Sequence, residues 1–207
     1  MRQLLLLTAV GLVGCTCEGT GPPPSVRAIG QPGPPGHRTS RAPDPPSAPA
    51  DHPQVKRAQG AVKQLKVSLK EALLGALKQG PEQAVEVCAA RAQAITQVVS
   101  QDGLVIGRAS HQLRNPINKP KPWVEPLLRS YVARSAGPRY RTVELPKGVM
   151  GYVEPIYATR ICATCHGSQV GGSVAQRIQQ HYPKDRAIGF AAGDLRGVFW
   201  VEVPRAP

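Results

Sequence analysis

Residues 140–166 read YRTVELPKGVMGYVEPIYATRICATCH and predict a β-hairpin that runs into a pair of cysteines. The segments 140–145 and 149–157 are rich in β-branched and aromatic residues, which indicates two strands. Pro146, Lys147 and Gly148 lie between them and form a hairpin signal. We therefore expect two antiparallel strands directly before the cysteines.

The cysteine pair belongs to the motif Cys162-Ala163-Thr164-Cys165-His166, which has the form CxxCH. This motif is typical of c-type haem attachment, in which the thiols add across the haem vinyl groups and the histidine binds the iron. A redox-active CxxC pair needs no following histidine, and the sequence has no second CxxC or His-x-His cluster to complete a zinc site. The motif therefore predicts one covalently bound haem c with His166 as its proximal ligand.

The flanking sequence indicates an α+β domain. Apolar residues at steps of three and four predict helices over 54–79 and 81–100, separated by Gly80 and Pro81. The remaining expected elements are a turn at 102–103, a strand at 104–108, a stiff loop at 114–120, helices at 123–132 and 174–181, a Gly/Asp-rich turn at 189–197 and a last strand at 198–203. Helices followed by strands predict an antiparallel sheet with N-terminal helices. An all-helical cytochrome c would carry CxxCH near its N-terminus.

The first residues resemble a bacterial export signal. Arg2 is basic, residues 4–13 are apolar but too few to span a bilayer, and residues 12–15 (LVGC) resemble a lipoprotein box. We expect residues 1–14 to be a signal peptide and Cys15 to carry lipid. That lipid would anchor the chain on the periplasmic side of a membrane, the outer in preference to the inner. The alternative is an ordinary cleaved signal that leaves Cys15 and Cys17 as free thiols.

A proline-rich segment follows, over residues 15–53. Eleven of the 22 prolines fall between Glu18 and Pro53, with almost no large apolar residue. Such a composition cannot bury enough surface to offset the ordering of its backbone, so it predicts a disordered tether. Residues 54–207 remain, which is enough for one domain with its own core.

Positive charge concentrates in that domain. The first 53 residues carry four Lys/Arg and three Asp/Glu, which leaves 22 basic and 10 acidic residues. Nucleic acid is not an expected partner of an exported chain without a basic-aromatic pattern. We expect the basic residues to steer an acidic redox or signalling protein, or to pair with haem propionates. A generally basic soluble surface is the alternative, and the sequence indicates no oligomeric state.

The sixth position of the iron has four candidate ligands in the sequence: Cys88, His111, Met150 and His181. Spacing alone does not choose among them. Cys88 lies within a predicted helix beside Ala84 and Ala92, whose small side chains would let a flat porphyrin approach. A buried structural cysteine is the alternative. The two histidines lie in polar surroundings, and Met150 lies in a predicted strand.

Seven short motifs in order carry a resemblance to a known family: residues 84–88 (AVEVC), 106–110 (IGRAS), 114–118 (RNPIN), 152–156 (YVEPI), 162–167 (CATCHG), 182–189 (YPKDRAIG) and 193–197 (GDLRG). They resemble the haem-binding family of PAS-like c-type cytochromes, over about residues 80 to 203. The resemblance implies a PAS-like sheet behind N-terminal helices and an iron ligated by His166 and Cys88. Residues 171–180 look enlarged relative to that family.

Three further residues are candidates for the haem site. Arg108 and Arg114 are candidates for bidentate pairing with the propionates, with surface or strand-fixing roles as the alternative. Tyr152 is a candidate for packing on the porphyrin, and a plain core position is its alternative. Asn115 and Asn118 are expected to cap and stiffen a turn.

Cys/His ligation predicts a low reduction potential, because a thiolate donates electron density and stabilises ferric iron. The thiolate becomes a poor ligand once the iron is reduced or the sulfur protonated, which suits a switch. We therefore expect a lipid-anchored redox or gas sensor. A tethered electron-transfer cytochrome is the alternative. An enzyme such as a peroxidase is not expected, because a cysteine would block the iron.

Overall fold

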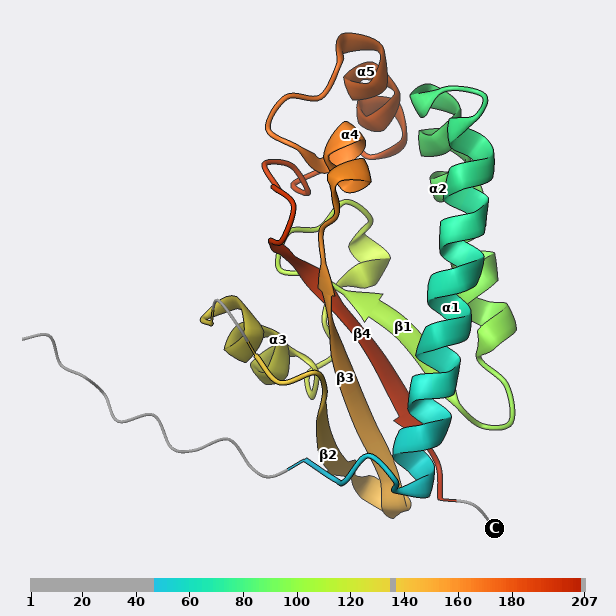
Figure 1. The fold of residues 1–207 in the computed structure, drawn as a ribbon, viewed down its shortest axis with the longest axis vertical. Coiled ribbons are helices and arrows are strands. Elements are labelled where there is room, and N and C mark those ends of the chain that lie inside the picture. The colour runs from blue at the N-terminus through green and yellow to red at the C-terminus, as the bar shows by residue number, and fades with distance from the viewer. Residues whose placement is uncertain (1–46, 135–136, 206–207) are drawn as a thin grey trace, which may run out of the picture. The chain divides into compact units, whose positions relative to one another are not determined.

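The computed structural model describes residues 47–134 and 137–205, all within the unit Asp44–Pro207. The predicted signal peptide, Cys15 and the predicted tether up to residue 46 lie outside the described residues. Two long helices open the described part (Figure 1), α1 at Pro53–Leu77 and α2 at Pro81–Val99. Each begins with a proline in its first turn, where the missing N–H has no helical partner to lose. Gly80 joins them with a φ of 118°, which suits glycine.

A four-stranded antiparallel sheet follows, in the order β1-β4-β3-β2. Its strands are β1 at Val105–Ala109, β2 at Arg141–Leu145, β3 at Val149–Tyr157 and β4 at Leu195–Val203. The predicted hairpin is confirmed as β2 and β3, and Lys147 and Gly148 turn the chain with φ values of 62° and 69°. The pairing of β3 with β4 shifts register between Ile156 and Tyr157, just before the CxxCH motif.

Helices cover both faces of this sheet. The apolar side of α1 packs against residues such as Ile106, Tyr152 and Val201 in the larger core cluster. Helix α3 at Glu125–Val132 packs on the other face, where Leu128 and Tyr131 meet Val153 and Val198. The predicted α+β class, with N-terminal helices and an antiparallel sheet, is confirmed.

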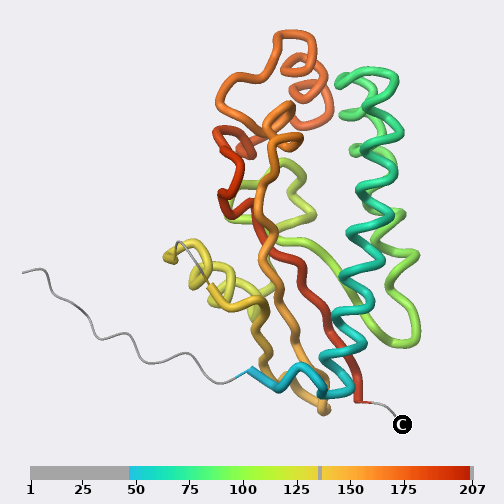
Figure 2. The backbone as a smooth tube through the Cα atoms, viewed as in Figure 1, coloured from blue at the N-terminus to red at the C-terminus, as the bar shows by residue number. Residues whose placement is uncertain are grey.

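The CxxCH motif lies beyond the end of β3. Its last four residues form the short helix α4 at Ala163–His166, and α5 follows at Gly172–His181. Figure 2 shows the chain leaving β3 and coiling through both helices at the end of the domain that α1 and α2 also reach. The enlarged segment 171–180 is thus a helix, and it packs on α2 where Val174 and Ile178 meet Val85.

Residues 47–52, the end of the predicted tether, lie against the sheet. The backbone N–H of Ala48 donates to Thr142 Oγ1 at 2.7 Å, and the Tyr140 hydroxyl donates to the Ala48 carbonyl at 2.8 Å. At the start of α1, Gln54 Nε2 donates to the Val203 carbonyl at 2.8 Å and to the Gly148 carbonyl at 3.3 Å. The folded domain therefore begins before residue 54. Among the described residues, no helix is both long and apolar enough to cross a membrane.

Candidate functional site

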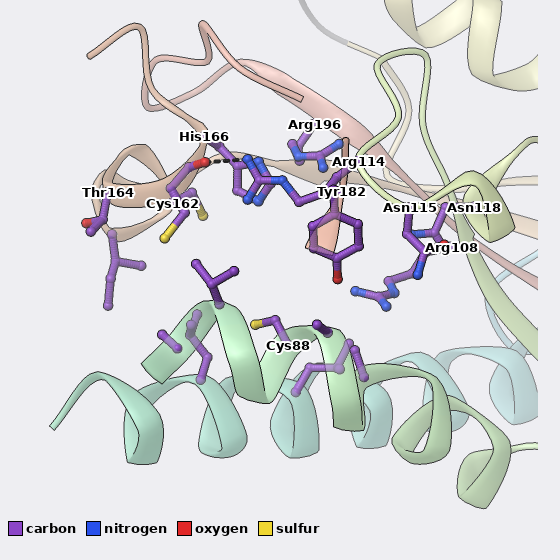
Figure 3. A pocket seen from close by; sticks show the side chains of 18 of the residues that line it. Cys88, Arg108, Arg114, Asn115, Asn118, Cys162, Thr164, His166, Tyr182 and Arg196 are labelled. Atoms are coloured by element: carbon purple, nitrogen blue, oxygen red, sulfur yellow. Dashed lines mark hydrogen bonds between the residues drawn. The ribbon is translucent and has the colours of Figure 1, made fainter. Parts of the chain in front are cut away.

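A cavity of about 240 Å³ lies between α2 and the CxxCH motif (Figure 3). Cys162, Cys165 and His166 line one side, and Cys88 lines the other. Apolar side chains of α1 and α2 supply much of the remaining wall: Leu69, Leu73, Leu77, Ala84, Val85, Ala89 and Ala92. The structure thus brings the CxxCH motif and one candidate sixth ligand, Cys88, to the same cavity.

The backbone carbonyl of Ala187 orients His166. His166 Nδ1 lies 2.8 Å from the Ala187 oxygen, which can only accept, so Nδ1 carries the proton. Nε2 then has a free lone pair, the arrangement common in metal-ligating histidines. The N–H of Phe190 also donates to the His166 carbonyl at 2.9 Å, so the loop 185–190 fastens α4 twice. Burial lowers the pKa of His166 to about 3, which keeps the imidazole neutral at ordinary pH.

Cys88 projects from α2 toward the CxxCH motif in Figure 3. Cys88 is exposed and lines the cavity. Burial raises the pKa of this thiol, and the nearby charges of Arg108 and Arg114 oppose that rise. The site therefore favours a neutral thiol but holds two cations that stabilise a thiolate.

Arg108 is an incompletely paired cation beside the cavity. It projects from β1 and lines the cavity near Cys88. Its Nε is buried without a hydrogen-bond partner among the described residues, and burial lowers the pKa of its guanidinium. A buried guanidinium N–H without an acceptor is costly, so this position is suited to an anionic ligand group.

Arg114 lines the cavity and also bonds to other parts of the protein. Its Nη2 donates to the Cys165 carbonyl at 2.5 Å, to Asp185 Oδ2 at 2.9 Å and to the Ala187 carbonyl at 3.3 Å. These bonds give Arg114 a fixing role, and its pairing with a haem propionate stays a prediction. Arg114 ties α4 to the loop that orients His166.

The other candidates for the sixth ligand do not line this cavity. Met150 lies at the start of β3, the end of the strand away from the CxxCH motif. His181 on α5 bonds Glu86 through Nε2 at 2.8 Å. His111 packs edge-on against Phe190, with ring centroids 6.0 Å apart. Tyr152 is also remote, since it is 1% exposed in the core and stacks on Tyr140.

Some residues of the site had no role predicted from the sequence. Phe190 lies edge-on to both His111 and His166, and Arg196 lies over its ring. Tyr182 lines the cavity beside Cys88, although its motif gave no sign of that role. Asn115 does cap a turn as expected, since its Oδ1 accepts from the Ile117 N–H at 3.0 Å.

A sequence model of the Tll0287-like family matches residues 39–204. The chain belongs to the Tll0287-like family. The structure is also similar to the crystal structure of the cyanobacterial heme-protein Tll0287, with a TM-score of 0.53 and 24% sequence identity. That match covers 72% of this chain and 95% of the other, and it shows a shared fold. No curated protein matches the chain. The family match covers the whole described domain, including the cavity with both cysteines of the CxxCH motif.

Proposed function

We propose that this member of the Tll0287-like family is a haem-binding protein with one haem c. Cys162 and Cys165 would attach the haem covalently, and His166 and Cys88 would be its axial ligands. The observation that carries this proposal is the placement of Cys88 on α2, across one cavity from the CxxCH motif. The name of the solved family member as a heme-protein supports it.

The residues present fit a haem. The apolar wall contains small side chains at Ala84, Ala89 and Ala92, which leave room for a flat ring. The unpartnered Nε of Arg108 is suited to a propionate oxygen. His166 presents a neutral ring whose Nδ1 proton is already used. When bound, haem would supply a one-electron redox centre and an iron that accepts small diatomic gases.

We infer that Cys88 makes the site a switch. Burial favours its protonated form, whereas Arg108 and Arg114 favour the thiolate. A thiolate ligand lowers the reduction potential. With haem bound, reduction would remove a positive charge that favours the thiolate, so Cys88 would more readily hold a proton. These properties favour a redox or gas sensor without enzymatic activity, on a PAS-like sheet.

Electron transfer is the second candidate, and one observation favours it. Among the described residues, the cavity and the cleft that adjoins it are lined by no acidic side chain and by six basic ones: Lys66, Lys70, Arg108, Arg114, Arg160 and Arg196. Such a concentration suits an acidic protein partner. For either function we propose a lipid anchor at Cys15 on the periplasmic side of a bacterial membrane, and no nucleic-acid partner.

Spectroscopy of the purified holoprotein tests the proposal. We expect haem to stay with the chain through acid–acetone extraction, and the oxidised protein to give a low-spin ferric thiolate signal by EPR. Cys88→Ala should abolish that signal while keeping the covalent haem. The matched control is Ala90→Ser, a comparably small change on the exposed face of the same helix, which should retain it. An unchanged spectrum in Cys88→Ala would remove Cys88 from the iron, and haem-free protein would overturn haem binding itself.

A further inference from the structure

A second, larger cleft of about 870 Å³ opens beside the cavity, between α1 and the end of β3. The two share residues next to the predicted haem attachment, including Cys162 and His166. Twelve of the described residues line the cleft and not the cavity, and among them are Lys66, Lys70, Leu74, Tyr157 and Arg160. We call these five the cleft mouth.

The cleft mouth combines exposed apolar groups with unpaired positive charge. Leu74 is 39% exposed and Tyr157 is 41% exposed, which is unusual for large apolar side chains. Lys66 pairs with Glu154, but Lys70 and Arg160 have no ion-pair partner among the described residues. No Asp or Glu lines the cleft within the described part of the chain. An apolar centre beside unpaired cations is typical of a surface that recognises an acidic protein.

The negative charge of a haem in the neighbouring cavity would not neutralise the positive charge of the cleft mouth. Its two propionates could neutralise two cations. Arg108 and Arg196 are the nearer candidates, because they line the cavity as well as the cleft, whereas the residues of the cleft mouth line the cleft alone. Lys70 and Arg160 would remain uncompensated. The surface also adjoins Cys162, so a molecule docked there would lie beside the attached edge of the haem.

We propose that the cleft mouth is the docking site for an acidic electron-transfer protein. This inference rests on the proposed haem site, and it adds the surface through which electrons would enter or leave. A concave cleft favours a protruding protein surface over a flat bilayer, which would touch only its rim. A redox sensor needs such a surface as much as an electron carrier does, because its iron must exchange electrons with a donor.

The oxidation of the ferrous holoprotein by oxidised plant plastocyanin, an acidic blue-copper protein, tests the docking site. Each reaction moves one electron from ferrous haem to Cu(II) and gives ferric haem and Cu(I), with no other reactant. The second-order rate constant is measured by stopped flow over a range of ionic strength. We expect it to fall as salt rises, because salt screens the attraction between the cleft mouth and the acidic protein.

The double variant Lys70→Glu/Arg160→Glu should slow this reaction by about tenfold at low salt and flatten its salt dependence. The matched control is Lys56→Glu together with Lys147→Glu, which makes the same change of charge outside the cleft, at the start of α1 and at the hairpin turn. Lys56 lies about 21 Å along the helix from Lys70, so its change should alter the rate less than about twofold.

Three results would overturn the docking site. The two double variants could slow the reaction equally, which would indicate net charge alone. The cleft variant could leave the rate at its unaltered value. It could also lose binding to phosphatidylglycerol vesicles without a change in the plastocyanin rate, which would assign the surface to a membrane. A protein that carries no haem would instead fail the proposed function, and pyridine haemochrome assay separates that case.

Discussion

Arg114 joins three segments of the chain through one guanidinium group. It contacts the Cys165 carbonyl, the Asp185 carboxylate and the Ala187 carbonyl, and the last of these also accepts from His166. Arg114 and Asp185 are only 11% and 7% exposed at their side chains. A buried ion pair of this kind stabilises little beyond its own desolvation, but removal of one member leaves an unpaired charge.

We therefore expect Arg114→Gln to destabilise the domain by about 3–5 kcal/mol, because Asp185 is left charged and buried. Urea unfolding of the holoprotein measures this loss. The double variant Arg114→Gln/Asp185→Asn should recover much of it. Arg129→Gln breaks an exposed pair with Glu125 and should cost less than about 0.5 kcal/mol. Equal losses in the buried and exposed variants would contradict a special role for Arg114.

His111 should make the domain sensitive to acid. Burial, assisted by the charge of Arg196, lowers the pKa of His111 below its ordinary value of 6.5. As the pH falls, His111 is therefore protonated in the unfolded chain before it is protonated in the folded domain. The stability that neutral His111 contributes is present above about pH 6.5 and is lost as the pH falls below that value. His111→Gln should show a smaller loss of unfolding free energy between pH 8 and pH 5. An identical pH profile in both proteins would exclude His111 as a cause.

At the scale of the element, α2 forms the wall of the cavity that faces the CxxCH motif. Its cavity side carries Cys88, Ala89 and Ala92, whereas Ala90 is exposed on another face. The helix was predictable because its apolar period is local and Gly80 with Pro81 marks its start. The period does not show what its cavity side faces, because the CxxCH motif lies far along the chain, and only the family resemblance paired Cys88 with His166.

Filling the cavity from α2 should block the haem. We expect Ala92→Phe to lower the haem content several-fold, since excess volume in a packed site costs about 1–3 kcal/mol. Ala90→Phe adds the same ring on the exposed face and should leave haem content unchanged. The ratio of haem to protein, from the pyridine haemochrome assay, measures both. Equal haem content in the two variants would show that the cavity is not the haem site.

The sequence predicted local features better than distant pairings. The hairpin, both long helices and the CxxCH motif follow from neighbouring residues, and the structure has each of these elements close to its expected bounds. The pairing of Arg114 with Asp185 joins residues 71 positions apart, and no periodicity reports such a contact. Phe190 was missed for the same reason, because only the folded loop brings it beside His166.

At the scale of the whole molecule, the residues before α1 belong to the fold. Ala48 bonds Thr142 and Tyr140 across more than 90 positions of sequence. A chain that starts at Ser47 should keep these bonds and match the unfolding free energy of the longer protein. A chain that starts at Pro53 should lose about 2 kcal/mol, since each of two hydrogen bonds contributes about 1 kcal/mol. Equal stability of the two truncated chains would show that residues 47–52 only rest on the sheet.

The start of α1 lies at one end of β3, and the cavity lies at the other end. The first turn of α1 bonds the carbonyl of Gly148 at the hairpin turn, and the CxxCH motif follows Tyr157 at the far end. Nine residue steps separate Gly148 from Tyr157, which is about 30 Å along an extended strand. Tension applied to the N-terminal segment would therefore act first on β2 and on the hairpin turn. If residues 15–46 form the predicted tether, we expect its length to have little effect on the residues that line the cavity.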